Sequence, residues 1–309
     1  MAVGNLTRTT HSVFAPELWA AEILEELRNA PPITKYLSTD VDMKAPAGYG
    51  DVISVRRPGA VTIGDKAAGT AFSSQYPAPT KVTVTLNKHK GAYTLFEDAA
   101  RLAIGDKVAQ DFIKDAANGI REQINTDILA SVWTNLANTN YVGSGGGAGI
   151  DSDDVAIAQS TLSTRKVPDA DRVLILHPTD MRLLHRDTAL SSYIAFSGPD
   201  AIRQGKIPEL YGFVLVPCPQ VATNCTYPVA NTRANVAMHK RGQLFASRPI
   251  AEPPPNSGAS GYSIEDPESG VVINVAMQYQ LPGRGLGIVV DCIYGIAELS
   301  EDRCIIVAG

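Results

Sequence analysis

The chain has 309 residues, of which 44% are hydrophobic and 19% are charged, and its formal net charge is -5. This length and composition allow a large buried core and exclude a disordered segment. No run of Lys or Arg is dense enough to form a nucleic-acid-binding patch, which argues against a dedicated DNA- or RNA-binding protein. The N-terminal sequence contains no apolar run long enough for a signal peptide or a membrane span, so we expect a protein that is made and used in a cytoplasm.

The N-terminal segment predicts an extended arm followed by a short amphipathic helix. Pro16 occupies a position that the first turn of a helix tolerates. Apolar residues, Trp19 among them, then recur at helical spacing over 18–27, and Pro31 ends the helix. Because a single helix cannot bury its apolar side alone, we expect it to dock on the rest of the protein or on a neighbouring molecule.

Residues 44–95 predict a long hairpin with a tip of small residues. The flanking runs, DVISVRR at 51–57 and KVTVTLNKH at 81–89, have the character of half-buried strands. Gly, Ala, Pro, Thr and Ser dominate between them, so the segment has too little apolar bulk to form a core, and such long loops are uncommon unless functional. We expect the hairpin to lie across another subunit, and we expect deletion of residues 58–80 to leave a folded subunit that no longer assembles.

A long amphipathic helix is expected from about residue 106 to about residue 135. Apolar residues recur every four positions from Val108 to Val132, and polar residues occupy the opposite face. At about 1.5 Å per residue the helix would span roughly 45 Å. Gly119 is the one interior position that weakens it. The tract GSGGGAG at 143–149 follows and is expected to be a flexible connection.

The remaining sequence predicts short mixed elements. Helices are expected at about 153–165 and over PTDMRLLHRD at 178–187. A buried strand is expected over RVLILHP at 172–178, and 252–261 is expected to be an exposed loop or hairpin tip. Further strands are expected at 213–217, 235–240, 271–280, 287–299 and over the closing RCIIVAG. The sequence has no internal repeat, which argues against solenoids and propellers.

No pattern supports a catalytic, cofactor-binding or metal-binding site. Gly283, Gly285 and Gly287 precede strand-like sequence, whereas a phosphate-binding turn follows a strand and opens a helix. His177 and His185 are too far apart in sequence to share one helical face around a metal, and His177 is expected to hydrogen-bond to backbone. A G-x-S-x-G nucleophile motif is absent from the sequence. We therefore predict a protein that is not an enzyme and has no cofactor.

Two further sets of residues have structural explanations. Asp153 and Asp154 lack the glycine and distal glutamate of a calcium-binding loop, and they are expected to cap the following helix and complement its dipole. The cysteines form no C-x-x-C pair, and small buried thiols are the expected role for all four: Cys218, Cys225, Cys292 and Cys304.

The order of these elements resembles the Hong Kong 97-like fold of the major capsid proteins of tailed bacteriophages. An arm, a long hairpin, a long helix and a compact mixed domain follow one another over nearly the whole chain. Four strings resemble that family locally: LFEDAARLA at 95–103, VLILHPTDMRLL at 173–184, GKIPELYGFVLVPCPQV at 205–221 and VAMHKRGQLFASR at 236–248.

The resemblance implies an α+β, L-shaped subunit with four parts. Residues 1–42 would form an N-terminal arm and short helix, and residues 43–92 an extended loop that reaches over a neighbour. The peripheral domain would comprise residues 93–150, which include the spine helix, and residues 242–298. The axial domain would comprise residues 151–241 and 299–309.

The resemblance also implies a structural subunit that self-assembles, through pentamers and hexamers, into an icosahedral head enclosing the phage genome. The protein would be assembled in the host bacterial cytoplasm and reside in the virion. Separate scaffolding, portal and decoration proteins are further candidate partners, packaged double-stranded DNA would lie nearby without specific binding, and no membrane is expected. Candidate inter-subunit contacts are Trp19, Arg56, Arg57, Gly64, Asp65 and Lys66, with solvated loop charges as the alternative for the hairpin positions.

Two other functions remain open. An encapsulin-like compartment shares this fold but packages cargo enzymes, so packaged DNA and a tail vertex would distinguish a virus from it. An unrecognised cytoplasmic enzyme would instead be a small oligomer with a deep pocket lined by convergent polar groups.

Overall fold

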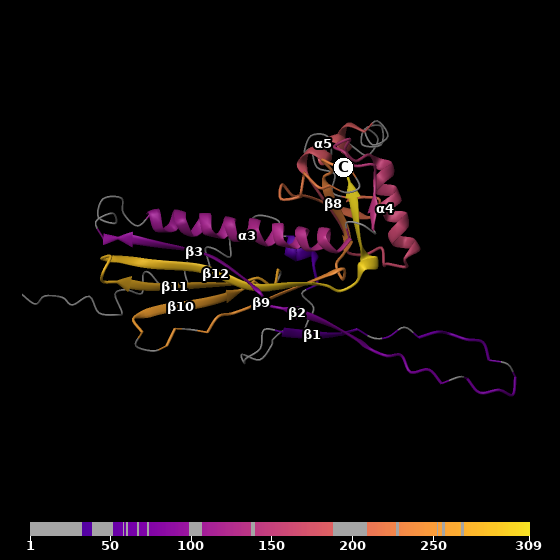
Figure 1. Cartoon of the computed structure of the whole chain (residues 1–309), viewed down its shortest axis with the longest axis horizontal. Helices are drawn as coiled ribbons and strands as arrows, with labels where there is room; N and C mark the ends of the chain where they lie inside the picture. The colour runs from indigo at the N-terminus through magenta and orange to yellow at the C-terminus, as the bar shows by residue number, and fades with distance from the viewer. Residues whose placement is uncertain are drawn as a thin grey trace, which may run out of the picture.

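The computed structural model describes residues 33–38, 52–57, 59, 61–66, 68–72, 74–98, 107–136, 140–187, 209–226, 229–251, 253–254, 257–266 and 269–309. The expected N-terminal helix, with Trp19, lies outside these residues. Figure 1 shows a long body of one helix beside a sheet, a compact body at one end of it, and a hairpin that projects from their junction.

The long body is built around one central strand, β12 (Gly285–Glu298). On one side β12 pairs with β3 (Lys88–Glu97), and its other neighbours are β11 (Val272–Gln280) and β9 (Gln243–Arg248). Strand β10 (Ala259–Glu265) completes this five-stranded, wholly antiparallel sheet beside β11. The structure therefore confirms the expected strands near 271–280 and 287–299.

The expected long helix is confirmed as α3 (Lys107–Leu136), which lies along the sheet (Figure 1). Its apolar residues at four-residue spacing, such as Ile120, Ile124 and Ile128, are at most 4% exposed. The 3.6-residue helical period places such residues on one face, and here that face covers β12 and β3.

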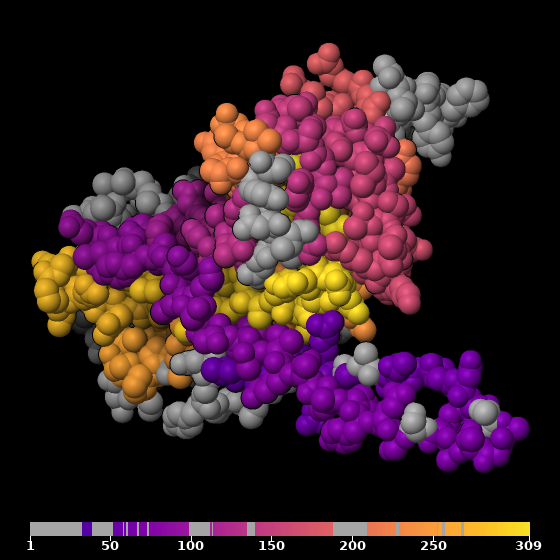
Figure 2. Space-filling view, turned by 45° about the vertical axis from the view of Figure 1, so that its right-hand side comes forward, coloured from indigo at the N-terminus to yellow at the C-terminus, as the bar shows by residue number. Residues whose placement is uncertain are grey.

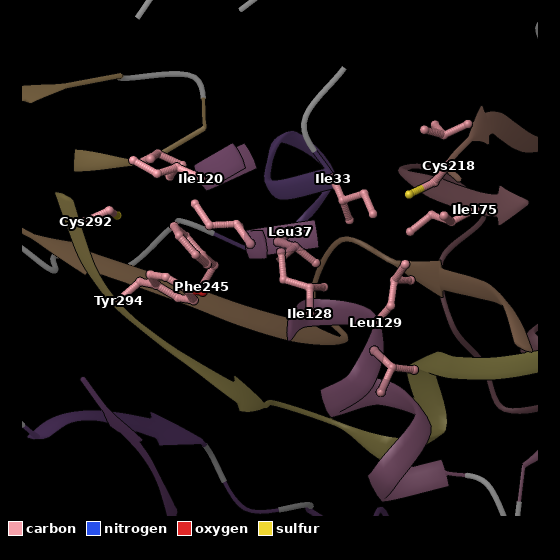
Figure 3. Packing of buried hydrophobic residues seen from close by; sticks show 14 of the residues in the cluster. Ile33, Leu37, Ile120, Ile128, Leu129, Ile175, Cys218, Phe245, Cys292 and Tyr294 are labelled. Atoms are coloured by element: carbon pink, nitrogen blue, oxygen red, sulfur yellow. The ribbon is translucent and has the colours of Figure 1, made fainter. Parts of the chain in front are cut away.

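A short segment before the hairpin fills the space between α3, the five-stranded sheet and the second sheet, which forms the compact body. It comprises η2 (Ile33–Tyr36) and the residues that follow, and Ser38 forms a bridge to Leu244 of β9. Figure 3 shows Ile33 and Leu37, both fully buried, between Tyr294 of β12 on one side and Ile175 on the other. Both sheets thus share one continuous core.

The compact body is a six-stranded mixed sheet. Its order is β4 (Tyr141–Val142), β13 (Cys304–Ala308), β8 (Ala234–His239), β5 (Arg172–Leu176), β7 (Phe213–Pro217) and β6 (Glu209–Leu210). Every residue of β5 is buried: the apolar run 173–176 predicts this, and the side chain of Arg172 is satisfied by the carbonyl oxygens of Pro168 and Val167. Helices α4 (Ser152–Thr164) and α5 (Pro178–Arg186) confirm the two expected helices. The turn η3 (Glu301–Arg303) carries the chain from β12 into β13 and so from one sheet to the other.

The run expected as one strand over 81–89 is divided between two elements. Strand β2 (Thr80–Thr85) pairs with β1 (Val52–Arg57) in the hairpin, whereas β3 begins at Lys88 and pairs with β12. The stretch 88–92, assigned from sequence to the extended loop, therefore lies in the five-stranded sheet. Alternating apolar and polar residues indicate which face of a strand is buried, but they do not indicate which strand is its partner. The switch in pairing from β1 to β12 could therefore not be predicted from the sequence.

Two expected details differ in the structure. The N-cap of α4 is Asp151 and not Asp153 or Asp154, and its side chain accepts a hydrogen bond from Asp154 N at 2.9 Å. Asp154 completes this capping box by accepting from Asp151 N at 3.4 Å, and both Asp153 and Asp154 lie in the first turn, where they complement the helix dipole as expected. The glycine tract 143–149 is also packed and is not a free connection. A side-chain carbon at Gly143, whose φ is +96°, would lie 2.4 Å from the carbonyl oxygen of Ala308.

Candidate functional site

The projecting hairpin, residues 52–85, carries large apolar side chains that the described part of the chain does not cover. Tyr76 is 90% exposed, Ile63 89% and Phe72 70%. Figure 2 shows the end of this hairpin extending clear of both bodies. Scattered exposed apolar residues are ordinary, but three of them on one narrow ribbon without a core indicate a surface that another molecule covers.

The end of the hairpin is ordered by its own side chains. The amide of Gln75 donates from Nε2 to Thr62 O at 2.7 Å and accepts from Thr62 N at 2.9 Å, so one side chain reproduces a strand-like pair of hydrogen bonds. Lys66 Nζ lies 5.5 Å from the ring centroid of Phe72. These contacts hold the two arms together where no core does.

The base of the hairpin is fastened to the long body by a small apolar cluster. Val84 is fully buried there against Leu244 and Ala246 of β9. Gly295 of β12 permits the approach, because a side-chain carbon at that position would lie 2.3 Å from Thr85 O. The hairpin therefore has an anchored base and an uncovered end.

The structure separates the predicted contact residues into three groups. Arg57 bonds within its own chain, donating to Leu299 O and to Ser300 Oγ, each at 3.3 Å. Arg56 lies on the opposite face of β1 and is exposed. The turn residues, Gly64, Asp65 and Lys66, lie together and are exposed towards the hairpin end.

Sequence reasoning did not single out the exposed apolar residues or Gln75. The available signal was the isolation of Ile63, Phe72 and Tyr76 in a stretch of small residues, where no neighbouring apolar side chains could bury them. No sequence pattern distinguishes Gln75 from a solvated glutamine.

A hollow of about 890 Å³ lies between the glycine tract and helices α4 and α5. Its carboxylates serve the N-terminus of α4: Asp151 caps the helix, and Asp187 accepts from Ser152 N at 2.9 Å. Burial is the main reason why the pKa of Asp154 is raised, and the neighbouring carboxylates add to it. Helix capping thus explains the acidic residues of this hollow.

His177 and the cysteines take the structural roles predicted for them. His177 is the N-cap of α5, and its Nδ1 accepts from Thr179 N at 3.2 Å. All four cysteines are free and buried, and burial raises the pKa of Cys292 and of Cys304 to about 12. Such thiols stay protonated at neutral pH and are poor nucleophiles.

Two kinds of feature are absent from the described residues. No group of three or more His, Cys, Asp or Glu side chains among them is arranged to hold a metal ion. None of the helices in the described part of the chain is both long enough and apolar enough to cross a membrane.

No family model matches the sequence, and no curated protein matches it. Solved structures do match in fold. A chain from Mycobacterium phage Che8 is 18% identical, with a TM-score of 0.61 over 90% of this chain and 91% of that one. A chain from the capsid of Cyanophage P-SCSP1u is 12% identical, with a TM-score of 0.60 over 84% and 83% of the two chains. A chain from the capsid of Cyanophage Pam1 is 10% identical, with a TM-score of 0.61 over 85% of each chain.

At these identities the likeness concerns the fold. The order of elements, the long helix beside an antiparallel sheet, the compact mixed sheet and the projecting hairpin all agree with it. The chain therefore has the Hong Kong 97-like fold.

Proposed function

We propose that this chain is the major capsid protein of a tailed bacteriophage, a structural subunit and not an enzyme. Copies of it would assemble through pentamers and hexamers into an icosahedral head that encloses the genome. The observation that carries the proposal is the anchored hairpin with its uncovered apolar end, in a fold that the chain shares with solved phage capsid subunits.

The hairpin supplies the driving force for contact between subunits. Burying a large apolar side chain contributes about 1.5–3 kcal/mol, so covering Ile63, Phe72 and Tyr76 on a neighbour favours association. The hairpin projects to one side of the subunit. Each copy would therefore extend its hairpin onto one neighbour and receive the hairpin of another. Such head-to-tail contacts between copies can close into rings. Many such contacts per shell add to its stability.

The two bodies have distinct roles in this proposal. The five-stranded sheet with α3 forms the peripheral domain, and the six-stranded sheet forms the axial domain around the five-fold and six-fold centres. The proposed limits are those of the sequence analysis, except that the extended loop ends before β3. Gly64, Asp65 and Lys66 would lie against the receiving subunit.

Other partners follow from the same proposal. Separate scaffolding, portal and decoration proteins would act with the subunit, and packaged double-stranded DNA would lie against the shell without specific binding. The protein would reside in the virion after assembly in the host bacterial cytoplasm.

Electron microscopy of the purified protein at high concentration tests the proposal. Closed shells with five-fold and six-fold clusters are expected, and particles isolated from the native host should contain nuclease-protected DNA and a tail vertex. Shells that contain protein cargo and no DNA would indicate an encapsulin-like compartment instead. A protein that stays monomeric, or forms only a small oligomer, under all assembly conditions would overturn the proposal.

A further inference from the structure

A pair of cations lies on the outward face of the hairpin without a counter-charge from any described residue. Arg56 and Lys81 are directly opposite each other in the register of β1 and β2, so their side chains project from the same face. Both are exposed, and neither has a hydrogen bond or an ion pair with another residue in the described ranges. Like charges directly opposite in a sheet are destabilising, so the pair costs free energy in the isolated subunit.

The neighbouring cation shows that the two faces of the hairpin differ. Arg57 follows Arg56 in β1 and therefore projects from the other face, where it bonds to Leu299 and Ser300 of its own chain. The outward face also carries Val52, which is 56% exposed. The described residues thus satisfy the inward face and leave the outward face uncovered.

The charge of the hairpin is opposite to that of the rest of the chain. Residues 52–85 contain four cationic side chains and one carboxylate, a formal net charge of +3, in a chain whose formal net charge is -5. The remaining residues therefore carry -8. A second copy of the chain offers the hairpin a surface of complementary charge.

An exposed acidic turn lies where the two bodies meet. Glu301 and Asp302 of η3 are exposed, and the side chain of neither forms an ion pair with a described residue. They line a hollow of about 320 Å³ together with Glu298, Leu299, Ser300, Val82 and Arg57. The two exposed carboxylates of Glu301 and Asp302 face a single guanidinium in this hollow, so its charge favours an additional cation.

We propose that Arg56 and Lys81 of one copy bind Glu301 and Asp302 of a neighbouring copy in the shell. This inference rests on the proposed function. Two cations on a face that also carries the exposed Val52 fit a protein surface better than a nucleic acid, whose binding depends on several phosphate contacts. One exposed ion pair contributes at most about 1 kcal/mol, but a closed shell repeats the contact in every subunit.

Charge reversal and its reciprocal rescue test the pairing. The double variant Arg56→Glu/Lys81→Glu and the double variant Glu301→Lys/Asp302→Lys should each fold, as shown by circular dichroism and thermal unfolding. Each should lose closed shells in electron microscopy and sedimentation, because attraction between copies becomes repulsion. The quadruple variant should regain closed shells, because the two charges have exchanged places.

A matched control separates the pairing from a change of net charge. The variant Lys114→Glu/Arg182→Glu alters two exposed residues of α3 and α5 by the same total charge and should assemble like the wild type. Normal assembly of Arg56→Glu/Lys81→Glu overturns the inference, and so does failure of the quadruple variant to improve on its folded parents. If a reversal variant unfolds, Arg56→Gln/Lys81→Gln should still raise the protein concentration needed for assembly, and an unchanged requirement overturns the inference. Failure of the wild type itself to form shells instead overturns the proposed function.

Discussion

The hydroxyl of Tyr294 on β12 donates a hydrogen bond to Asp127 Oδ2 on α3 at 2.7 Å. Lys88 Nζ, at the start of β3, lies 3.0 Å from the same oxygen. The Tyr294 ring is fully buried and stacks on Phe245, with 5.8 Å between the ring centroids. One carboxylate therefore joins the long helix to two strands and sets where the helix lies on the sheet.

Replacing Tyr294 by Phe should lower the free energy of unfolding by about 1–2 kcal/mol, because the ring packing remains while the hydrogen bond to a charged group is lost. Urea denaturation of the two subunits would measure the difference. Tyr93→Phe is the matched control, since that ring is 54% exposed, and it should be nearly neutral. Equal stability of Tyr294→Phe and the wild type would show that the bond does not hold the helix.

Asp127 should make stability depend on pH in the acid range. Burial by itself would raise the pKa of this carboxyl, but the hydrogen bonds from Tyr294 and Lys88 and the charge of Lys88 lower it below 3.8 overall. A carboxyl whose pKa is lower in the folded than in the unfolded protein stabilises the fold fully at pH values above its unfolded-state pKa. This stabilisation is lost as the pH falls through its folded-state pKa. Asp127→Asn should therefore cost more stability at pH 7 than at pH 3, as measured by urea denaturation. An equal cost at both pH values would contradict the assignment.

The compact body depends on an ion pair between Asp180 of α5 and Arg233, the residue just before β8. Asp180 is fully buried, and Arg233 Nε lies 2.8 and 2.9 Å from its two carboxylate oxygens, while Asn235 Nδ2 donates to Oδ2 at 2.8 Å. Arg233→Ala should lower stability by about 3–5 kcal/mol, because it leaves a buried carboxylate without its cation. Thermal unfolding would measure the loss. The exposed Arg182 of α5 supplies the control, and Arg182→Ala should be within about 0.5 kcal/mol of the wild type.

The fit of the hairpin base can be tested at a glycine. Gly295→Ala places a carbon against the backbone of Thr85, so it should cost about 1–3 kcal/mol and displace the base of the hairpin. Gly64→Ala is the matched change at the hairpin end, where an added carbon would meet nothing within 4 Å, and it should leave stability unchanged. Denaturation and proteolysis of the two variants would compare them, and equal behaviour would show that the base is loosely held.

The hairpin end should be needed for assembly and not for folding. Replacing residues 58–79 by Asn-Gly joins β1 to β2 through a tight turn that suits a two-stranded hairpin. The variant should keep the thermal stability of the wild type and form no closed shells in electron microscopy. An unfolded variant would show that the removed residues belong to the core of the subunit.

The sequence by itself determined most of the elements and the exposed character of the hairpin. The repeat of apolar residues in α3, the unbroken apolar run of β5 and the lack of apolar bulk between β1 and β2 are local properties, and burial follows them directly. The element order was also sufficient to predict the fold. These features needed no knowledge of which segments meet.

Only the tertiary structure decided the pairings between distant residues. The change of partner between β2 and β3, the bond from Arg57 to Leu299, the Asp180–Arg233 pair and the bridge from Gln75 to Thr62 all join positions separated along the chain. Periodicity reports which side of an element is buried, whereas a partner is set by the path of the whole chain. For that reason two adjacent arginines differ in their surroundings. Arg56 is exposed, whereas Arg57 donates a hydrogen bond to the backbone oxygen of Leu299.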